Sequence, residues 1–366
     1  MSSTNAPASS VVVARLFLPD DANIAGNVHG GTTLKLMEEA GMIAATRHMS
    51  TSEASKASDG NCLAALVRFE HMAFHKPVSV GELGSCKCEI IFTSNQSILV
   101  EVMVTAENIS KGKTRVTNTG WLWYVPMAPS SVDGTGKRVD WKPVQVLPVP
   151  IPDGEDDDAL KKYEKAKEMY EKRKSNGNND CDEAGESTPA CATEEGNNKF
   201  DTFKNQYTTP SDGHSPAESE QVLCQMVLPG DCGVGDIAFG GFVMKMMDNA
   251  AGCSAFRHCR TNIVTVAISD LDFQSWVKLG DLCTVRSKVV FASSKSLDIE
   301  VVASAASFGE DTVVAKGLFT FVSIGSDGRA KNVPKLRLES EEDMQKAHMG
   351  KQRYEAAKAA RLAGKR

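Results

Sequence analysis

The chain has 366 residues, of which 41% are hydrophobic and 24% are charged, so it is long enough for about two domains of ordinary globular composition. No run of 18 apolar residues occurs, which argues against a transmembrane helix, and a net charge of −6 argues against a nucleic-acid partner. The first residues have neither the pattern of a secretory signal nor the arginines of a transit peptide, so a cytoplasmic location is expected.

The chain contains an internal duplication. The segment AGNVHGGTTLKLMEEAGMIAATRH at 25–48 returns as GDIAFGGFVMKMMDNAAGCSAFRH at 235–258, without a gap and with an offset of 210 residues. A second set of matches follows at an offset of 199, first between 74–82 and 273–281. The repeat unit is therefore about 125 residues long, which is the size of one domain.

Each repeat begins with a helix and continues with strands. Residues 32–46 and 242–256 lack proline and are apolar on most sides, which predicts two buried helices of about four turns. Four segments rich in valine, isoleucine and aromatic residues follow each helix and predict strands. These segments are 62–74, 85–94, 97–110 and 115–127 in the first repeat, and 262–273, 282–293, 296–307 and 312–324 in the second. We therefore predict an α+β fold in which an antiparallel sheet wraps around a central helix in each domain.

The duplication also sets the expected domain boundaries. The first domain is expected at 10–150 and the second at 220–335. Between them, 151–219 combines a charged helical stretch with a low-complexity segment that is expected to be disordered. The end of the chain, 336–366, is expected to form a similar amphipathic helix. Both helices mix acidic and basic residues at i,i+4 spacing, which is typical of a solvated helix face and not of a nucleic-acid-binding arm.

The ten cysteines do not predict a metal site. No CxxC pair occurs, and Cys86 and Cys88 are too close in sequence for a zinc knuckle. Free, reduced thiols are the better interpretation, and no metal or redox cofactor is expected.

A pair of glycines opens each helix, at 30–31 and at 240–241. Unpaired N–H groups and the positive end of the helix dipole lie at such a start, so residues without side chains there allow a carbonyl oxygen to approach and an oxyanion to be stabilised. Close packing of the helix against a strand explains the same glycines without a ligand. The sequence leaves both interpretations open.

Each helix also carries an acidic residue among apolar neighbours. Glu38 comes nine residues after His29, and Asp248 comes nine residues after Phe239. A buried carboxylate is unfavourable unless partners compensate for its lost hydration, so both acids are candidates for function, with a partnered structural acid as the alternative. His29 is more typical of a residue that caps the helix or shapes the loop than of a general base.

The segment DDANIAGNVHGGTTLKLMEEAGMIAATRH at 20–48, the polar turns FTSNQS and SSKS, and the tandem arrangement resemble the tandem hotdog acyl-CoA thioesterases, in particular their cytosolic long-chain branch. The resemblance covers nearly the whole chain outside the linker. It implies two hotdog domains that pair as an intramolecular pseudo-dimer, and hydrolysis of fatty acyl-CoA to fatty acid and CoA without a cofactor. It also implies a homo-oligomer, a trimer of such chains.

In that family, each site combines the loop and helix start of one domain with the helix acid of the other. The resemblance therefore implies a catalytic pair of Asn23 and Asp248, in which Asp248 is either the general base for water or the nucleophile. His29, Gly30 and Gly31 are expected to bind the substrate, with a glycine N–H polarising the thioester carbonyl.

Two polar turns after strands are expected to contact CoA, with an ordinary β-turn as the alternative. The residues concerned are Thr93, Ser94, Ser294, Lys295 and Ser296.

The mirror site, on the side of Glu38, is expected to be degenerate. Gly233 stands where the first repeat has Asn23, and Phe239 stands where it has His29. Because one site is lost, a protein that binds acyl-CoA without hydrolysing it is the alternative function. The presence of both Asn23 and Asp248 argues against that alternative.

Overall fold

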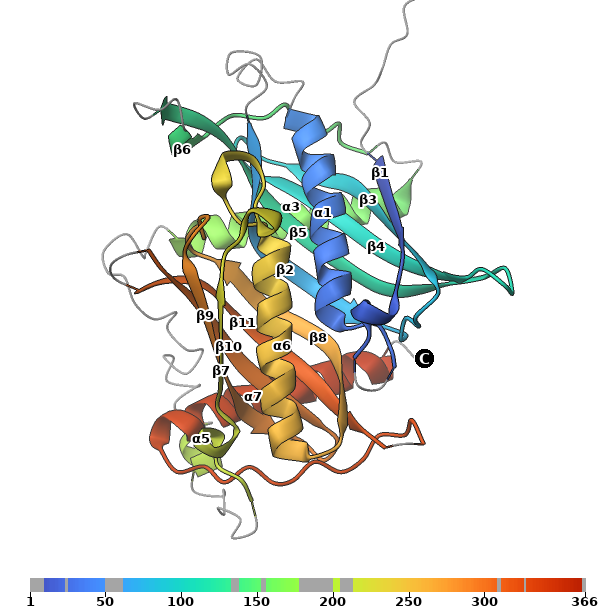
Figure 1. The fold of residues 1–366 in the computed structure, drawn as a ribbon, viewed down its shortest axis with the longest axis vertical. Coiled ribbons are helices and arrows are strands. Elements are labelled where there is room, and N and C mark those ends of the chain that lie inside the picture. The colour runs from blue at the N-terminus through green and yellow to red at the C-terminus, as the bar shows by residue number, and fades with distance from the viewer. Residues whose placement is uncertain are drawn as a thin grey trace, which may run out of the picture.

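The computed structural model describes residues 10–23, 26–49, 62–132, 138–152, 156–177, 200–204, 213–307, 311–325 and 327–363. Most of the low-complexity segment that was expected to be disordered, SNGNNDCDEAGESTPACATEEGNN, lies outside these residues. Within them, the chain forms two copies of one α+β domain, as predicted (Figure 1).

The two domains repeat the same order of elements. The first contains β1 (Ser10–Leu16), the 3-10 turn η1 (Pro19–Asp21), α1 (Gly30–Met49), β2 (Leu63–Phe74), β3 (Leu83–Thr93), β4 (Ile98–Asn108), β5 (Lys113–Val132) and β6 (Arg138–Pro143). The second contains β7 (Gln221–Met226), η3 (Pro229–Asp231), η4 (Val234–Asp236), α6 (Gly240–Cys259), β8 (Asn262–Phe273), β9 (Leu282–Ala292), β10 (Ser296–Ala306) and β11 (Asp311–Ile324). Both predicted core helices and all eight predicted strands are present.

One antiparallel sheet of 11 strands runs through both domains, in the order β1-β3-β4-β5-β2-β8-β11-β10-β9-β7, with β6 paired to β5. The domains meet at β2 and β8, where Phe69 lies opposite Leu271 and Met72 lies opposite Ile268. The offset of 199 makes Ile268 the counterpart of Phe69 and Leu271 the counterpart of Met72. The two cross-strand pairs are therefore equivalent, and exchanging the two domains leaves the register unchanged. This is the symmetry of an isologous dimer, and it confirms the predicted pseudo-dimer within one chain.

The two core helices lie side by side on one face of this sheet (Figure 1). Each helix approaches the other at its second glycine: a Cβ on Gly31 would lie 2.9 Å from Cα of Lys245, and a Cβ on Gly241 would lie 3.0 Å from Cα of Lys35. The second glycine of each pair is therefore explained by close packing of the two helices. The first faces a strand of the other domain, since a Cβ on Gly30 would lie 3.1 Å from the Thr265 hydroxyl oxygen and a Cβ on Gly240 would lie 2.8 Å from Leu66.

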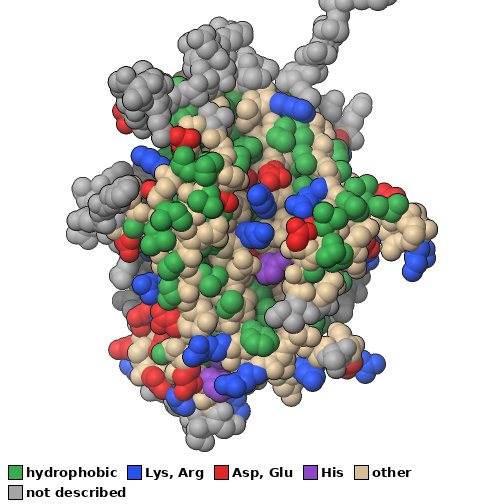
Figure 2. All heavy atoms as spheres, in the orientation of Figure 1, with side chains coloured by type: hydrophobic (Ala, Val, Ile, Leu, Met, Phe, Trp, Pro, Cys, Tyr) green, Lys and Arg blue, Asp and Glu red, His purple; other side chains and the backbone are tan. Residues whose placement is uncertain are grey.

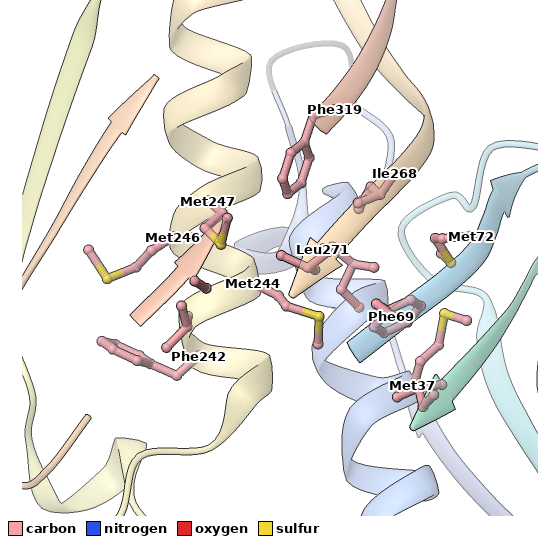
Figure 3. Packing of buried hydrophobic residues seen from close by; sticks show 14 of the residues in the cluster. Met37, Phe69, Met72, Phe242, Met244, Met246, Met247, Ile268, Leu271 and Phe319 are labelled. Carbon is pink, nitrogen blue, oxygen red and sulfur yellow. The ribbon is translucent and has the colours of Figure 1, made fainter. Parts of the chain in front are cut away.

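Apolar side chains from both helices meet the sheet in one core (Figure 3). Met37 of α1 and Met244 of α6 are fully buried. So are Phe69 and Leu271, which lie where β2 pairs with β8. Methionine fills irregular gaps well, which suits a core in which two domains meet.

Helices α3 (Asp157–Gly177) and α7 (Glu341–Ala363) cover strands of the first and second domain, respectively. Tyr163 of α3 packs against Phe92 with ring centroids 5.5 Å apart, and Tyr354 of α7 packs against Phe291 at 6.0 Å. Each domain thus carries its own trailing amphipathic helix, as the sequence predicted. Among the helices that the structure describes, none is both long enough and apolar enough to cross a membrane.

The far end of each core helix is tied to a segment that follows the domain's last strands. Nε2 of His48 lies 2.8 Å from the carbonyl oxygen of Leu147, and Nε2 of His258 lies 3.0 Å from that of Pro334. The two histidines therefore hold the fold together.

Candidate active site

Asp248 of α6 is completely buried and accepts hydrogen bonds from both domains. The Gly31 N–H donates to Oδ2 at 2.7 Å, and Nδ1 of His29 lies 3.0 Å from the same oxygen. The Thr265 hydroxyl donates to Oδ1 at 2.8 Å. Three donors around one carboxylate compensate for its lost hydration, so the acid can remain buried at the junction of the domains.

The hydrogen-bond distances around His29 are best explained if its Nδ1 carries a proton and donates a hydrogen bond to Asp248. Nδ1 also lies 3.1 Å from the Gly31 nitrogen, but that N–H is already directed to Asp248 at the shorter distance. Burial by itself lowers the pKa of His29, but the hydrogen bond to Asp248 and the negative charge of Asp248 outweigh burial and raise the pKa above its usual value. The pair therefore favours an imidazolium beside a carboxylate.

The backbone around His29 explains how the side chain is held in place. Its N–H donates to the Asp21 carbonyl at 2.8 Å, and its carbonyl accepts from the Thr32 N–H at 3.1 Å in the first turn of α1. The Asp21 side chain is in turn paired with Arg15 at 2.7 Å. His29 thus shapes the start of the helix, as predicted, and also contacts the catalytic candidate directly.

Asn23 lies in the same loop and reaches the same site. Its Oδ1 accepts from the Asn27 N–H at 3.2 Å, and its own N–H donates to the Asn27 carbonyl at 2.7 Å. These two bonds fix the orientation of the side-chain amide. Asn23 and His29 line the same two cavities, and His29 contacts Asp248, so Asn23 lies near the acid through His29, while the pairing of Asn23 with Asp248 stays a prediction.

Two adjoining cavities meet at Asn23, His29 and Ile263. The smaller, of about 370 Å³, runs past Gly30 and is lined largely by apolar side chains. These are Val28, Phe74, Pro77, Val78, Ile263, Val264, Val266, Phe321 and Ile324. The larger, of about 860 Å³, follows the second half of α6 and is lined by Arg257 and Arg260. On the face shown in Figure 2, Lys and Arg side chains gather over the core helices beside a histidine.

The sequence did not identify Thr265, Arg257 or Arg260 as residues of this site. Thr265 looks like an ordinary strand residue, although its counterpart in the first repeat is Leu66, and that difference within the duplication was a usable signal. Arg257 lies in the last turn of α6, where a cation complements the helix dipole, and it also forms part of the wall of the larger cavity.

The mirror site is built around Glu38, which is buried in α1 with fewer partners. The backbone N–H of Gly241 bonds to its carboxyl group, whereas Oε2 has no hydrogen-bond partner among the described residues. Burial raises the pKa of Glu38 to about 8, and the neighbouring charge of Glu39 contributes in the same direction. This acid is therefore held mainly in its neutral form at pH 7.

Three substitutions separate the two sites. Gly233, Phe239 and Leu66 stand where the Asp248 site has Asn23, His29 and Thr265. The first two changes depend on each other, because a Cβ on Gly233 would lie 2.7 Å from a ring atom of Phe239. The phenyl ring thus fills the space into which an asparagine side chain would extend. The degeneracy expected from the sequence also includes the loss of the threonine donor.

The turn residues predicted to contact CoA are not brought to either acid. The Thr93 hydroxyl accepts from the Val149 N–H at 2.8 Å, and the Ser294 carbonyl accepts from the Val333 N–H at 3.0 Å. Each turn is therefore bonded to a segment that follows the last strand of its own domain. None of the five residues is among the described residues that line the cavities beside Asp248 and Glu38. The role in CoA binding stays a prediction for Thr93, Ser94, Ser294, Lys295 and Ser296.

The contact between His29 and Asp248 predicts a pH-dependent stability. Replacing His29 by glutamine is expected to lower the free energy of unfolding more at pH 5.5 than at pH 8.5. The folded protein holds the His29 proton more tightly than the unfolded chain, so this stabilisation is fully present below the unfolded pKa of about 6.5 and is lost as the pH rises through the folded pKa. Urea unfolding of both proteins at the two pH values measures the difference. An equal loss at both would mean that His29 stabilises only through packing and the helix start.

Comparison with known proteins agrees with this architecture. A family model described as the thioesterase superfamily matches residues 25–113 and 235–307, once in each repeat. The cytosolic acyl coenzyme A thioester hydrolase of Homo sapiens is 34% identical over 366 residues, covering 97% of this chain and 85% of that protein. The uncharacterized acyl-CoA thioester hydrolase YkhA of Bacillus subtilis strain 168 is 31% identical over 129 residues, covering 35% of this chain and 75% of that protein, a length close to one repeat.

Among solved structures, a Lactobacillus plantarum protein assigned as an oleoyl thioesterase superposes with a TM-score of 0.52 at 8% identity, covering 86% of this chain and 95% of that one. At this identity the likeness supports the fold alone. The match to the human protein runs over nearly the whole length of both chains, through both repeats and both helix acids. The chain belongs to the thioesterase superfamily, in the family of the cytosolic acyl coenzyme A thioester hydrolases.

Proposed function

We propose that the protein hydrolyses fatty acyl-CoA thioesters to free fatty acid and CoA, as an enzyme of fatty acid metabolism, at one site shared between its two domains. The observation that carries this proposal is the fully buried Asp248, held by donors from both domains beside a cavity lined by Asn23 and Gly30. A carboxylate fixed next to a helix start provides a base and a carbonyl-polarising group at one place.

The two glycines divide the roles that the sequence assigned to them together. The Gly31 N–H is engaged by Asp248. The Gly30 N–H has no hydrogen-bond partner in the described part of the chain, lines the smaller cavity and opens α1. Gly30 is therefore the donor for the thioester carbonyl oxygen, where the positive end of the helix dipole also stabilises the developing negative charge.

Asp248 acts as the general base in this proposal. Its carboxylate is completely buried, which leaves no room for direct attack on an acyl carbon, whereas its partners His29 and Thr265 line the smaller cavity, where a water molecule positioned by Asn23 would lie. Asp248 takes a proton from the water as the water oxygen attacks the carbonyl carbon. The C–S bond then breaks, and the CoA thiolate leaves and takes up the proton. The imidazolium of His29 stabilises and orients the carboxylate without contacting the reacting bond.

The adjoining cavities suit the two parts of the substrate. The smaller cavity is mostly apolar and accommodates the acyl chain beyond the carbonyl. The larger cavity contains Arg257 and Arg260, which are exposed and can pair with the phosphates of CoA. Substrate would thus lie across the contact between the first-domain loop and α6, with the thioester near Asn23 and Gly30.

The test is thiol release from decanoyl-CoA and palmitoyl-CoA by the wild-type chain, beside Asn23→Gly. This variant introduces the residue that the mirror site has at the same position. We expect turnover by the wild type and a fall of about 10²-fold or more in the variant, because the water loses its orienting group. Thermal unfolding shows whether the variant remains folded. Binding of acyl-CoA without any thiol release by the wild type would favour the alternative, a protein that binds acyl-CoA but does not hydrolyse it.

The same proposal includes the setting in which the enzyme acts. A cytoplasmic location fits the relatives, which are named as cytosolic. We propose assembly as a homotrimer of these two-domain chains, as the family resemblance implies, and neither a nucleic-acid partner nor a cofactor besides the CoA of the substrate.

A further inference from the structure

The mirror site has lost its polar partners but keeps a cavity. About 420 Å³ lie between α1, β2 and the second-domain loop, within the range of roughly 300–1,000 Å³ that is typical of small-molecule sites. Most of the wall is apolar, and it includes Ile43, Leu66, Phe239, Phe273, Trp276 and Val314. The cavity reaches solvent beside the exposed Arg47.

One polar residue in the wall of this apolar space has a carboxyl oxygen without a partner. Glu38 is only 2% exposed and lines the cavity, yet its Oε2 has no hydrogen bond within the described structure. A buried polar atom that lacks a partner is unfavourable, and the large majority of such atoms in proteins are bonded. A ligand with a polar atom at this point would provide the missing partner.

We propose that this cavity binds an unbranched acyl chain whose carbonyl oxygen accepts a hydrogen bond from the protonated Glu38 carboxyl group. The proposal rests on the proposed function, because it takes the acyl group from the same class of substrate. Two compounds carry this group, the acyl-CoA and the fatty acid product. The mirror site would bind without hydrolysing, since it lacks the counterparts of Asn23, His29 and Thr265.

The surroundings of Glu38 favour the neutral, donating form. Burial raises its pKa to about 8 and the charge of Glu39 adds to this, while the Gly241 N–H and the charge of Lys35 act in the opposite direction. From the sheet, the Tyr124 hydroxyl donates to the backbone carbonyl of Glu38 at 3.2 Å.

The remaining ionisable groups of the cavity are at its wall and mouth. Cys62 and Arg47 line it together with Glu38. At neutral pH, the carboxylic acid of Glu38 is therefore the donor at the closed end of the cavity, and Arg47 is the charge at the mouth.

The inference is tested by calorimetric titration of the full chain carrying Asp248→Asn, which prevents turnover of the ligand. The probes are decanoyl-CoA, decanoate and CoA alone, at pH 6.5 and at pH 9.5. We expect a binding event at the mirror cavity in addition to the one beside residue 248, with decanoyl-CoA, decanoate or both, and not with CoA alone. Its affinity should fall about tenfold at pH 9.5, where Glu38 loses its proton and with it one hydrogen bond.

Two further substitutions in the same background locate the event. Glu38→Leu removes the donor and is expected to weaken binding about tenfold, while Glu38→Gln keeps a donor and is expected to remove the pH dependence. Val243→Phe fills the cavity from α6 and should abolish the event if the chain remains folded. Binding with decanoyl-CoA only would identify the substrate as the occupant, and binding with decanoate only would identify the product.

A single binding event with every probe, or a second event that neither Glu38→Leu nor Val243→Phe changes, would overturn the inference. Failure of the proposed function is separate, because it is measured as thiol release by the wild type. Hydrolysis by the wild type without a second binding event contradicts only the inference about the mirror cavity. A second binding event without hydrolysis contradicts only the catalytic proposal.

Discussion

Replacing Asp248 by asparagine is expected to lower the rate of acyl-CoA hydrolysis by about 10²–10⁴-fold, the usual contribution of a positioned general base. The amide is nearly the same size as the carboxylate but cannot take a proton from water. Its amide oxygen can still accept from the Gly31 N–H and from His29, and its NH₂ group can donate to the Thr265 hydroxyl, so the variant loses the base and keeps the buried contacts. Thiol release at saturating and limiting substrate separates the loss in kcat from the loss in binding.

Asp298→Asn is the matched control for this change. Asp298 is also a buried aspartate of the second domain, where it accepts from the Thr320 hydroxyl at 2.9 Å. Thr320 lines none of the described cavities, whereas His29 and Thr265, the partners of Asp248, line the smaller one. It should keep its turnover. Glu38→Gln tests the claim of a single site, since it makes the same chemical change at the pseudo-equivalent position. A comparable loss in Glu38→Gln would mean that both sites work, and an unaffected Asp248→Asn would remove Asp248 from the reaction.

The duplication made most of the fold predictable. Because both repeats show the same sequence pattern, the buried helices, the eight strands and their order could be identified. Three strands were missed: β6, and the strands at the two ends of the sheet, β1 and β7. In β1, burial alternates along the strand although the sequence does not. Val11 of β1 is buried whereas Val12 is 62% exposed, and the surrounding sequence, SSVVVARLF, looks like a short apolar stretch at the start of the chain.

The site was only partly predictable because its parts come from different domains. Asn23 and Asp248 could be paired through the family resemblance, but nothing local to either residue indicates that they share a site. The contact between Gly31 and Asp248 spans 217 residues. Thr265, on strand β8, donates a further hydrogen bond to the Asp248 carboxylate. Its role depends on the close approach of the two helices. Such a contact follows from the tertiary structure and not from a motif.

Comparison of the two sites explains how one could be lost without loss of the fold. Gly31 and Gly241 are both needed where the helices touch, so the Gly-Gly pairs persist in both repeats. The side chains of His29 and Thr265, in contrast, act as hydrogen-bond partners of Asp248. Once Phe239 and Leu66 replaced them, the mirror acid could remain buried only by keeping its proton.

The protonated state of Glu38 leads to the second large effect. Replacing Glu38 by leucine is expected to raise the free energy of unfolding at pH 9 by about 3–5 kcal/mol, on the basis of about 1.36 kcal/mol for each pH unit by which the folded pKa of about 8 exceeds the unfolded value of 4.5. The folded protein holds a proton that the unfolded chain releases above pH 4.5. Wild-type stability therefore falls as the pH rises from 4.5 to about 8, and the leucine variant lacks this fall. Urea unfolding of both proteins at pH 4.5, 6.5 and 9 measures it.

The matched change at the other site should have the opposite sign. Asp248→Leu leaves the Gly31, His29 and Thr265 donors without their common acceptor, and breaking such a buried set by removing one partner destabilises by about 3–5 kcal/mol. Glu39→Gln removes the neighbouring carboxylate and, because the Glu39 charge helps to raise the Glu38 pKa, should stabilise the protein at pH 9 by much less than Glu38→Leu. A pH-independent effect of Glu38→Leu would mean that Glu38 is ionised and partnered, against the assignment of a neutral acid. If the two variants change stability as expected, Glu38 destabilises the fold and is retained because it binds a ligand. Asp248 is stabilised by its partners in the fold and is retained for catalysis.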